Sequence, residues 1–396
     1  MTIQNTILRN SKNFSYGLNA ISVGSQKLNT INQCRSAIQL GSKSSVTPGD
    51  IRSYNTSNVD VGKVKTNFPK PFVFKNNERN SIIELFSQIT VNPYKNYQDF
   101  NAEVKSILQR PELQRFTEAC DKYNQTPKID QPIFYATNCP VDRELPVLGF
   151  DNPVQAKRDN KSTFVAEAFL LAYALAASQE PIGYINVNEG DIFQDIKPLK
   201  GMENTQSQKA LNTINFHKDL ANHFVRPDWV NILGIVGDPR NNILTTFVDN
   251  KTLLSILPEH VINELQQKSY HTPFDDLTVL KGSKKLGEAD VHPIIGGKGP
   301  SDIRFFENRT KGLTPQSQDA INQLTNALHT LKVGINIQPG VFVGAANNEC
   351  THGKEVIEIK DKESAKERWL MKTVNVESLE EHKKYILNGQ ERIING

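Results

Sequence analysis

The middle of the chain carries a series of apolar runs that are too short and too closely spaced to be helices. They cover 183–187, 213–216, 230–236 and 243–248, and Gly, Pro, Asn and Asp residues separate them. A further segment, 333–343, has the pattern of a strand, a turn and a second strand. These runs predict β-strands. Because helices do not alternate regularly with them, the pattern favours a sandwich or jelly roll over a parallel βαβ sheet.

Helical periodicity appears before this β-rich region. Between Asn80 and Tyr123, apolar residues recur at three- and four-residue spacing, with Asn80 as the expected N-cap and Pro111 as a break. A second apolar helix is expected to start near Ser162 and to stop before Pro181. These helices are expected to pack against the β-rich core.

Two more helices are expected later in the chain. One covers 258–267, and the other begins at Thr314, a good N-cap, with Pro315 in its first turn. The segment 270–312 between them is rich in Gly, Pro and charged residues and predicts loops around short strands. Together these elements predict an α+β fold, with a jelly-roll core that helices flank.

The N-terminal part differs in composition from the rest of the 396 residues. Residues 1–70 are rich in Ser, Asn and Thr, and no Asp or Glu precedes Asp50. We interpret this part as a polar, flexible extension, although an acid-free head also fits an organelle transit peptide. The remaining 71–396 are expected to form one domain, with helical support over 80–180 and a jelly-roll core over about 183–375.

The overall composition excludes several classes of protein. The net charge of +3 gives no support for a nucleic-acid partner. No apolar run reaches the ~18 residues that a membrane span needs. The cysteine spacings match neither a metal knuckle nor a disulfide framework, which indicates buried or incidental thiols at Cys34, Cys120, Cys139 and Cys350. A cytoplasmic location is expected, with organelle targeting as the alternative.

One short pattern in the β-rich region has the spacing of metal ligands. His217-Lys218-Asp219 follows the predicted strand 213–216. Residues i and i+2 of a strand point to the same face, so an imidazole nitrogen and a carboxylate oxygen would face one ion. Two ligands make a weak site, and the pair taken alone also fits a structural or surface role.

A third ligand has to come from another strand, and His352 is the best placed of the remaining histidines. It follows the predicted strands of 333–343, and the small Gly353 leaves room beside its ring. The other histidines lie in predicted helices or loops; they are His223, His260, His271, His292, His329 and His382. Two histidines and one carboxylate form the facial triad of non-haem Fe(II) oxygenases, which leaves positions open for a co-substrate and dioxygen.

Arg368 is the candidate for binding a carboxylate of such a co-substrate. It lies in the segment 366–372, KERWLMK, and a guanidinium matches a carboxylate through two parallel hydrogen bonds. Taken alone, this residue also fits a surface arginine.

Six segments occur in an order that resembles a known family. They are 193–198 (FQDIKP), 216–219 (FHKD), 225–228 (VRPD), 245–246 (TT), 352–354 (HGK) and 368–370 (RWL). Together they resemble the clavaminate synthase-like branch of the Fe(II)/2-oxoglutarate-dependent oxygenases. That branch is related to taurine dioxygenase and includes hydroxylases of free arginine, asparagine and lysine. The resemblance covers 163–374, about half of the chain.

The resemblance implies a double-stranded β-helix core, Fe(II) as the metal, and 2-oxoglutarate and O₂ as co-substrates. The implied metal ligands are His217, Asp219 and His352. The residues implied to bind the distal carboxylate of 2-oxoglutarate are Arg368 and one or both of Thr245 and Thr246. The candidate substrate-binding residues are Gln194, Gln206, Ser207, Gln208, Arg304, Glu307 and Lys372.

The chain departs from the family pattern at three places. The amino-acid hydroxylases generally have Glu where this chain has Asp219, and the taurine dioxygenase group has Asp. The second cation after the RWL motif is Lys372 instead of Arg, so it cannot form a planar bidentate pair. The spacing from His352 to Arg368 is two residues longer than expected, which indicates a small insertion within 355–366.

The function that the resemblance implies is hydroxylation of an unactivated C–H bond of a small amino acid or amino-acid-like molecule, with release of succinate and CO₂. The expected partner is therefore this small-molecule substrate, without nucleic acid or membrane. Two alternatives remain open: the same dioxygenase chemistry on a peptide or sulfonate-like substrate, and a non-catalytic jelly-roll binding protein. A zinc hydrolase is disfavoured because no HExxH pattern is present.

Overall fold

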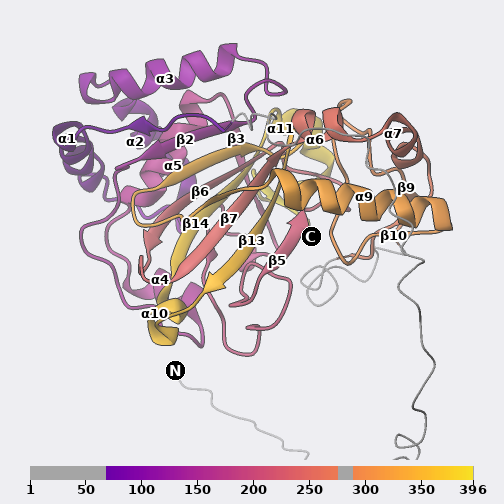
Figure 1. Ribbon diagram of the computed structural model, residues 1–396. Helices are drawn as coiled ribbons and strands as arrows, with labels where there is room; N and C mark the ends of the chain where they lie inside the picture. The colour runs from indigo at the N-terminus through magenta and orange to yellow at the C-terminus, as the bar shows by residue number, and fades with distance from the viewer. Residues whose placement is uncertain (1–67, 275–288, 396) are drawn as a thin grey trace, which may run out of the picture. The chain divides into compact units, whose positions relative to one another are not determined.

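Two β-sheets face one another between two groups of helices in the computed structural model, which describes residues 68–274 and 289–395 (Figure 1). Of the predicted N-terminal extension over 1–70, only the last three residues lie within this described part. The extension therefore stays a prediction. One of these three residues, Phe68, packs edge-on against Tyr135, with their ring centroids 5.6 Å apart.

The larger sheet has eight strands and is mostly antiparallel. Its order is β1 (Phe72–Val73), β2 (Ile133–Thr137), β12 (Phe342–Ala346), β6 (Trp229–Val236), β14 (Trp369–Val376), β3 (Glu180–Tyr184) and β15 (Ile393–Ile394), with β4 (Gln194–Ile196) also paired to β14. Parallel pairing occurs at the two ends of this order, between β1 and β2 and between β15 and β3. A large antiparallel sheet in an α+β fold agrees with the sequence analysis.

The smaller sheet has four strands and lies against one face of the larger one. Its order is β11 (Val333–Ile335), β7 (Asn242–Asp249), β13 (Cys350–Glu358) and β5 (Ile214–His217). Side chains alternate between the two faces of a strand. Val230 and Val374 of the larger sheet therefore meet Phe247 and Ile335 of the smaller sheet in one buried apolar cluster.

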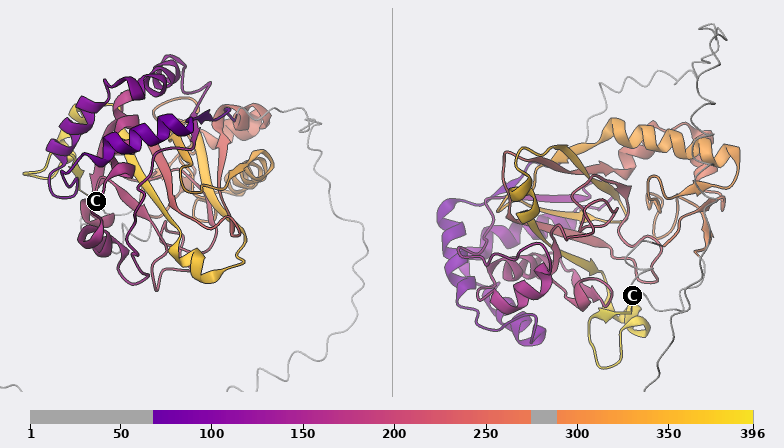
Figure 2. Two further views of the ribbon diagram at one scale, coloured as in Figure 1. Left: turned by 90° about the vertical axis from the view of Figure 1, so that its left-hand side faces the viewer. Right: turned by 90° about the horizontal axis from the view of Figure 1, so that it is seen from below.

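Helices α1 (Asn76–Ser87), α2 (Tyr97–Ile107), α3 (Gln114–Gln125), α4 (Pro153–Asn160) and α5 (Val165–Ala176) precede most of the strands. Of these, α5 is apolar all round and buried over ten of its residues, which is typical of a core helix. It packs on the outer face of the larger sheet, where Leu233 and Met371 belong to the same cluster as Phe169. Figure 2 shows this helical layer on the side of the larger sheet away from α9.

The opposite side carries α6 (Asn250–Ile256), α7 (Glu259–Leu265) and α9 (Pro315–Leu331), together with the short strands β8 (Tyr270–His271), β9 (Val291–His292) and β10 (Lys311–Gly312). The predicted cap of α9 is confirmed, because the Thr314 hydroxyl accepts a hydrogen bond from the Ser317 amide at 3.1 Å. The apolar stripe of α9 packs on α7 through buried leucines such as Leu324 and Leu328.

One local prediction is wrong, and one segment that was expected to be helical also contains a strand. Helix α1 begins at Asn76 and not at Asn80, because Lys75 is the N-cap and its amide donates to the Glu78 carboxylate at 2.8 Å. Strand β2 lies within 80–180, where helical support was expected, and pairs with β12 of the larger sheet. Strand β2 has only five residues, and its antiparallel partner β12 lies far along the chain, so the local sequence gives little indication of a strand.

The expectations about cysteines and about membrane-spanning helices can be compared with the described residues. Cys120, Cys139 and Cys350 are free and buried, as predicted for incidental thiols, while Cys34 lies outside the described residues. Between residues 68 and 395, leaving aside 275–288, no helix is both long and apolar enough to cross a bilayer. The cytoplasmic location remains a prediction.

Candidate active site

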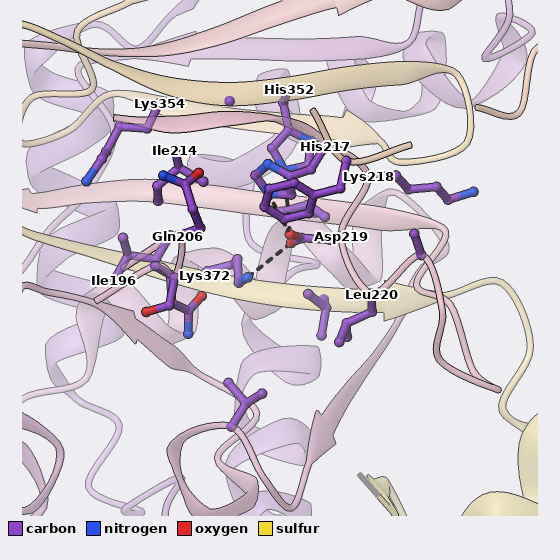
Figure 3. Close-up of a pocket in the computed structure, with 18 of the residues that line it drawn as sticks. Ile196, Gln206, Ile214, His217, Lys218, Asp219, Leu220, His352, Lys354 and Lys372 are labelled. Atoms are coloured by element: carbon purple, nitrogen blue, oxygen red, sulfur yellow. Dashed lines mark hydrogen bonds and ion pairs between the residues drawn. The ribbon is translucent and has the colours of Figure 1, made fainter. Parts of the chain in front are cut away.

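Three potential metal ligands meet at the edge of the smaller sheet. His217 ends β5 and is the Cα partner of His352 on β13, and Asp219 follows His217 by two residues. One ligand atom from each of the three lies within 4.8 Å of the others. Asp219 Oδ1 is 3.3 Å from His217 Nε2 and 3.6 Å from His352 Nε2 (Figure 3). This spacing leaves room for one ion between the three side chains.

The protonation states also suit a metal. Burial raises the pKa of Asp219, but the nearby Lys372 ammonium and the two imidazoles outweigh burial and hold that pKa well below its usual range. Burial and the neighbouring His217 lower the pKa of His352, so its imidazole is neutral near pH 7. His217 Nδ1 lies 2.8 Å from the carbonyl oxygen of Asn215, which directs Nε2 towards the site. A carboxylate and neutral imidazoles are the forms that bind metals.

A second layer of contacts holds Asp219 in place. Its amide donates to Asn347 Oδ1 at 3.1 Å, and Asn347 Nδ2 donates to the carbonyl oxygens of Asp219 and Pro227 at 3.2 and 2.8 Å. Leu220 follows with a φ of +53°, a left-handed conformation that costs a branched side chain about 1–2 kcal/mol. The sequence analysis assigned no role to Asn347.

The three side chains open into a pocket between the two sheets. Alternation along β14 and β6 places Leu370, Val374 and Val230 on its walls, while their neighbours face the helices. Arg368, just before β14, also lines this pocket. Its side chain is buried, and its terminal Nη2 makes no hydrogen bond in the described part of the chain. A buried guanidinium nitrogen without a partner indicates a place for an acceptor from a ligand.

Lys354 is a cation of this pocket that the sequence analysis missed. It follows His352 by two residues on β13 and is the Cα partner of Thr245 on β7. Thr245 and Lys354 both line the pocket, whereas the adjacent Thr246 does not. Burial, together with the charge of Arg368, lowers the pKa of Lys354 to about 7. The i, i+2 spacing from His352 is the signal that could have identified it.

Gly353, between these two residues, lies close to both neighbouring strands. A Cβ atom there would lie 3.0 Å from the carbonyl oxygen of Ile214 and 3.2 Å from Thr246 Oγ1. The close approach of β5 and β7 therefore favours a glycine at this position.

The glutamine candidates lie on the wall of the pocket, but they differ in how free their amides are. Gln206 uses both ends of its amide on the backbone, with Nε2 donating to Thr213 O and Oε1 accepting from Asn215 N, each at 3.0 Å. Ser207 also lines the pocket, and its hydroxyl accepts from the Lys209 amide at 3.0 Å.

Two other members of the candidate set keep a free donor. Gln194 on β4 and Gln208 each have a buried Nε2 without a hydrogen-bond partner in the described part of the chain. These two side chains therefore have donors available for a ligand.

Arg304 and Glu307 are not among the residues that line this pocket, and their role in substrate binding stays a prediction. Arg304 binds Asn222 Oδ1 and the Asp290 carboxylate. Glu307 accepts from the Phe216 amide at 3.1 Å and contacts His329 Nε2 at 2.8 Å. Arg304 therefore connects two loop positions, Asn222 and Asp290, whereas Glu307 connects its own loop to β5 and α9.

Lys372 lies on β14 and faces the metal ligands. Its Nζ is 3.0 Å from Asp219 Oδ2, the carboxylate oxygen that does not face the histidines (Figure 3). The segment expected to carry an insertion, 355–366, contains most of α10 (Lys362–Glu367), which connects β13 to Arg368.

The pKa of Glu349, close to the potential metal ligand His352 in sequence, leads to a prediction of how stability depends on pH. Burial raises the pKa of Glu349 to about 7; Lys218 and Lys128 oppose this rise, and Asp302 and Asp228 add to it. Because the folded state binds this proton more tightly than the unfolded state, its contribution to stability is present at low pH and is lost as pH rises through about 7.

We therefore expect Glu349→Gln, which stays neutral, to be more stable than the wild type at pH 8 by about 1–2 kcal/mol, and to show a smaller gain at pH 5. Urea unfolding at both pH values measures this difference. Glu363→Gln, at a side chain that is 81% exposed, is the control. An equal effect of Glu349→Gln at the two pH values would contradict the prediction.

Comparison with solved structures identifies the fold. An asparagine oxygenase solved with Fe(II), 2S,3S-3-hydroxyasparagine and succinate superposes with a TM-score of 0.70 at 17% identity, over 83% of this chain and 100% of that chain. The non-heme iron oxygenase OrfP, solved with Fe and alpha-ketoglutaric acid, gives 0.67 at 16% identity, over 82% and 100%. The fold is therefore that of the non-haem iron oxygenases.

Curated relatives give the finer relationship. The chain is 25% identical over 196 residues to L-asparagine oxygenase of Streptomyces coelicolor, and 23% identical over 296 residues to clavaminate synthase 2 of Streptomyces clavuligerus. It is 25% identical over 181 residues to L-lysine 3-hydroxylase of Catenulispora acidiphila. These names confirm the resemblance to the clavaminate synthase-like oxygenases.

The extent of these matches varies. The match covers 49% of this chain for L-asparagine oxygenase, 74% for clavaminate synthase 2 and 44% for L-lysine 3-hydroxylase. The chain spans about half the length of the asparagine oxygenase (57%) and of the lysine hydroxylase (49%), and 88% of clavaminate synthase 2. No protein-family model matches the chain.

Proposed function

We propose that this protein is an Fe(II)/2-oxoglutarate-dependent oxygenase that hydroxylates an unactivated C–H bond of a small amino acid or amino-acid-like molecule. The main support is that His217, Asp219 and His352 converge at one end of a pocket. The same pocket contains the buried Arg368, whose Nη2 has no hydrogen-bond partner in the described part of the chain. The relatives named for asparagine, lysine and clavaminate support an amino-acid-like substrate over a peptide or a sulfonate.

The residues present fit the implied metal and co-substrate. His217, Asp219 and His352 would hold Fe(II), since two imidazoles and one carboxylate are its facial triad. When bound, the metal and 2-oxoglutarate supply the oxidation, in which O₂ is consumed and succinate and CO₂ leave. We further propose that the two facing sheets are the two halves of a double-stranded β-helix.

The chain itself contributes binding, orientation and exclusion of water. Arg368 offers its unpaired Nη2 to the distal carboxylate of the co-substrate, and Thr245 adds a hydroxyl on the facing strand. Lys354 brings a second cation to the same end of the pocket. The apolar walls from Val230 and Val374 keep water away from the C–H bond, which protects the reaction from side products.

The test is succinate release by purified protein with Fe(II), ascorbate, 2-oxoglutarate and a panel of amino acids and amino-acid derivatives. We expect succinate at a level well above that of a His217→Ala control, with at least one member of the panel stimulating it. Metal analysis of the purified protein separates this function from a non-catalytic binding protein. Equal succinate from the wild type and His217→Ala under all conditions would overturn the proposal.

A further inference from the structure

The charges that line the pocket are strongly unbalanced. Its cationic lining residues are Lys218, Arg309, Lys354, Arg368 and Lys372. Among the described lining residues, Asp219 is the only carboxylate. Lys218 forms a salt bridge with Asp302 and donates a hydrogen bond to Asn348 Oδ1, and neither partner lines the pocket. Arg309 lies over the Phe306 ring and donates to the Phe274 carbonyl oxygen. The other three cations, Lys354, Arg368 and Lys372, lie on β13, just before β14 and on β14.

This imbalance persists after the metal and the co-substrate are counted. On the β13 and β14 side of the pocket, a divalent metal with Asp219 leaves one positive charge, and the three cations Lys354, Arg368 and Lys372 raise the sum to four. The two carboxylates of 2-oxoglutarate lower it to two, or to one when Lys354 is neutral. An uncompensated charge in a pocket of low dielectric constant is costly. A zwitterionic substrate leaves this charge unchanged, a basic one increases it, and an anionic one reduces it.

The unsatisfied hydrogen-bonding groups point the same way. Gln194 Nε2, Gln208 Nε2 and Arg368 Nη2 are buried in the pocket without partners in the described part of the chain, and all three are donors. Buried donors need acceptors. A carboxylate brings acceptors only, whereas a free ammonium brings three more donors.

The acceptor that a substrate ammonium would need is already engaged. Asp219 faces the two histidines through Oδ1 and pairs with Lys372 through Oδ2 at 3.0 Å. Lys372 therefore occupies the position from which an ammonium would pair with the free oxygen of this ligand. It also presents its remaining N–H groups to the pocket, where a substrate carboxylate can accept them.

We propose that the substrate is a net-anionic acid, either an acidic amino acid or an N-acylated amino acid, and that Lys372 selects it by pairing with its carboxylate. This inference rests on the proposed function for its chemistry and names the substrate class. The apolar wall formed by Val187, Leu220, Val230 and Val374 receives the uncharged part of the molecule.

Succinate release with three sets of compounds tests the proposal. The sets are anionic (L-aspartate, L-glutamate and N-acetyl amino acids), zwitterionic (L-asparagine and L-leucine) and cationic (L-arginine and L-lysine). We expect kcat/KM to be at least about tenfold higher for the best anionic compound than for any zwitterion, and lowest for the cations. Within the first set, the free acids and the acetylated compounds distinguish the two sources of negative charge.

Variants of Lys372 connect the preference to this residue. Lys372→Gln is expected to raise the KM for the anionic compound by about tenfold or more while changing the KM for 2-oxoglutarate little. Lys372→Arg keeps the charge and is expected to keep the order of preference. Lys360→Gln removes the same charge at a side chain that is 59% exposed and serves as the control.

A calorimetric titration of the same compounds into the protein without added metal gives a readout that does not need turnover. The expected order of affinity is anionic, zwitterionic, cationic, with the anionic advantage reduced in Lys372→Gln. Equal or stronger binding of zwitterionic or basic amino acids, with the order unchanged in Lys372→Gln, would overturn the proposal. If no compound gives succinate above the His217→Ala level, the proposed function fails, and the calorimetric order still decides the substrate class.

Discussion

Replacing Asp219 with alanine is expected to remove the bound iron and to lower substrate-dependent succinate release by more than about 100-fold. Even residues that only orient a metal ligand cost 10–100-fold when they are lost, and Asp219 is a ligand in this account. The substitution also leaves Lys372 without its carboxylate partner, so a positive charge would face the two imidazoles. Both effects weaken binding of a cation.

Metal content after anaerobic loading, measured by mass spectrometry alongside succinate release, checks this result. Asp151→Ala makes the same chemical change at a side chain that is 79% exposed, and we expect it to bind iron normally. Asp219→Glu, which keeps the carboxylate one methylene further out, is expected to fall between the two. Stoichiometric iron in Asp219→Ala would contradict the assignment of this residue as a ligand.

Replacing Arg368 with alanine is expected to raise the KM for 2-oxoglutarate by about 10–100-fold, because a hydrogen bond to a charged group contributes about 1.5–3 kcal/mol. Burial lowers the pKa of this guanidinium to about 10, which still leaves it charged at pH 7. Arg368→Lys keeps a charge but loses the fork, so its KM is expected to lie between those of the wild type and the alanine variant.

Steady-state kinetics with 2-oxoglutarate as the varied compound measure this effect, and iron content should stay at the wild-type level. Arg110→Ala, at a side chain that is 55% exposed, is the matched control. An unchanged KM for 2-oxoglutarate in Arg368→Ala would contradict the assignment of the distal carboxylate to Arg368.

The parts of the fold that could be predicted are those with local causes. Helix α9 was placed correctly because Thr314, Pro315 and the apolar stripe lie in one continuous segment. The start of α5 depends on a distant residue, since Asp142 accepts hydrogen bonds from the Val165 and Ala166 amides at 3.1 Å. No spacing rule connects residues that are more than twenty positions apart.

The site shows the same limit. The pair His217 and Asp219 has a local signature, and ordered motifs added His352 and Arg368. The role of Lys354 depends on the register of β13 against β7, which places it opposite Thr245. Arg304 was expected near the substrate from its position in the chain, but its guanidinium already binds Asn222 and Asp290, which no local pattern indicated.

The most direct test of the central claim is a crystal structure of the full chain grown without oxygen in the presence of Fe(II) and 2-oxoglutarate, with anomalous data collected at the iron edge. We predict one iron peak coordinated by His217, Asp219 and His352, with the distal carboxylate of 2-oxoglutarate on Arg368. An iron peak at another position, or none at these three residues despite bound iron in the sample, would contradict the account.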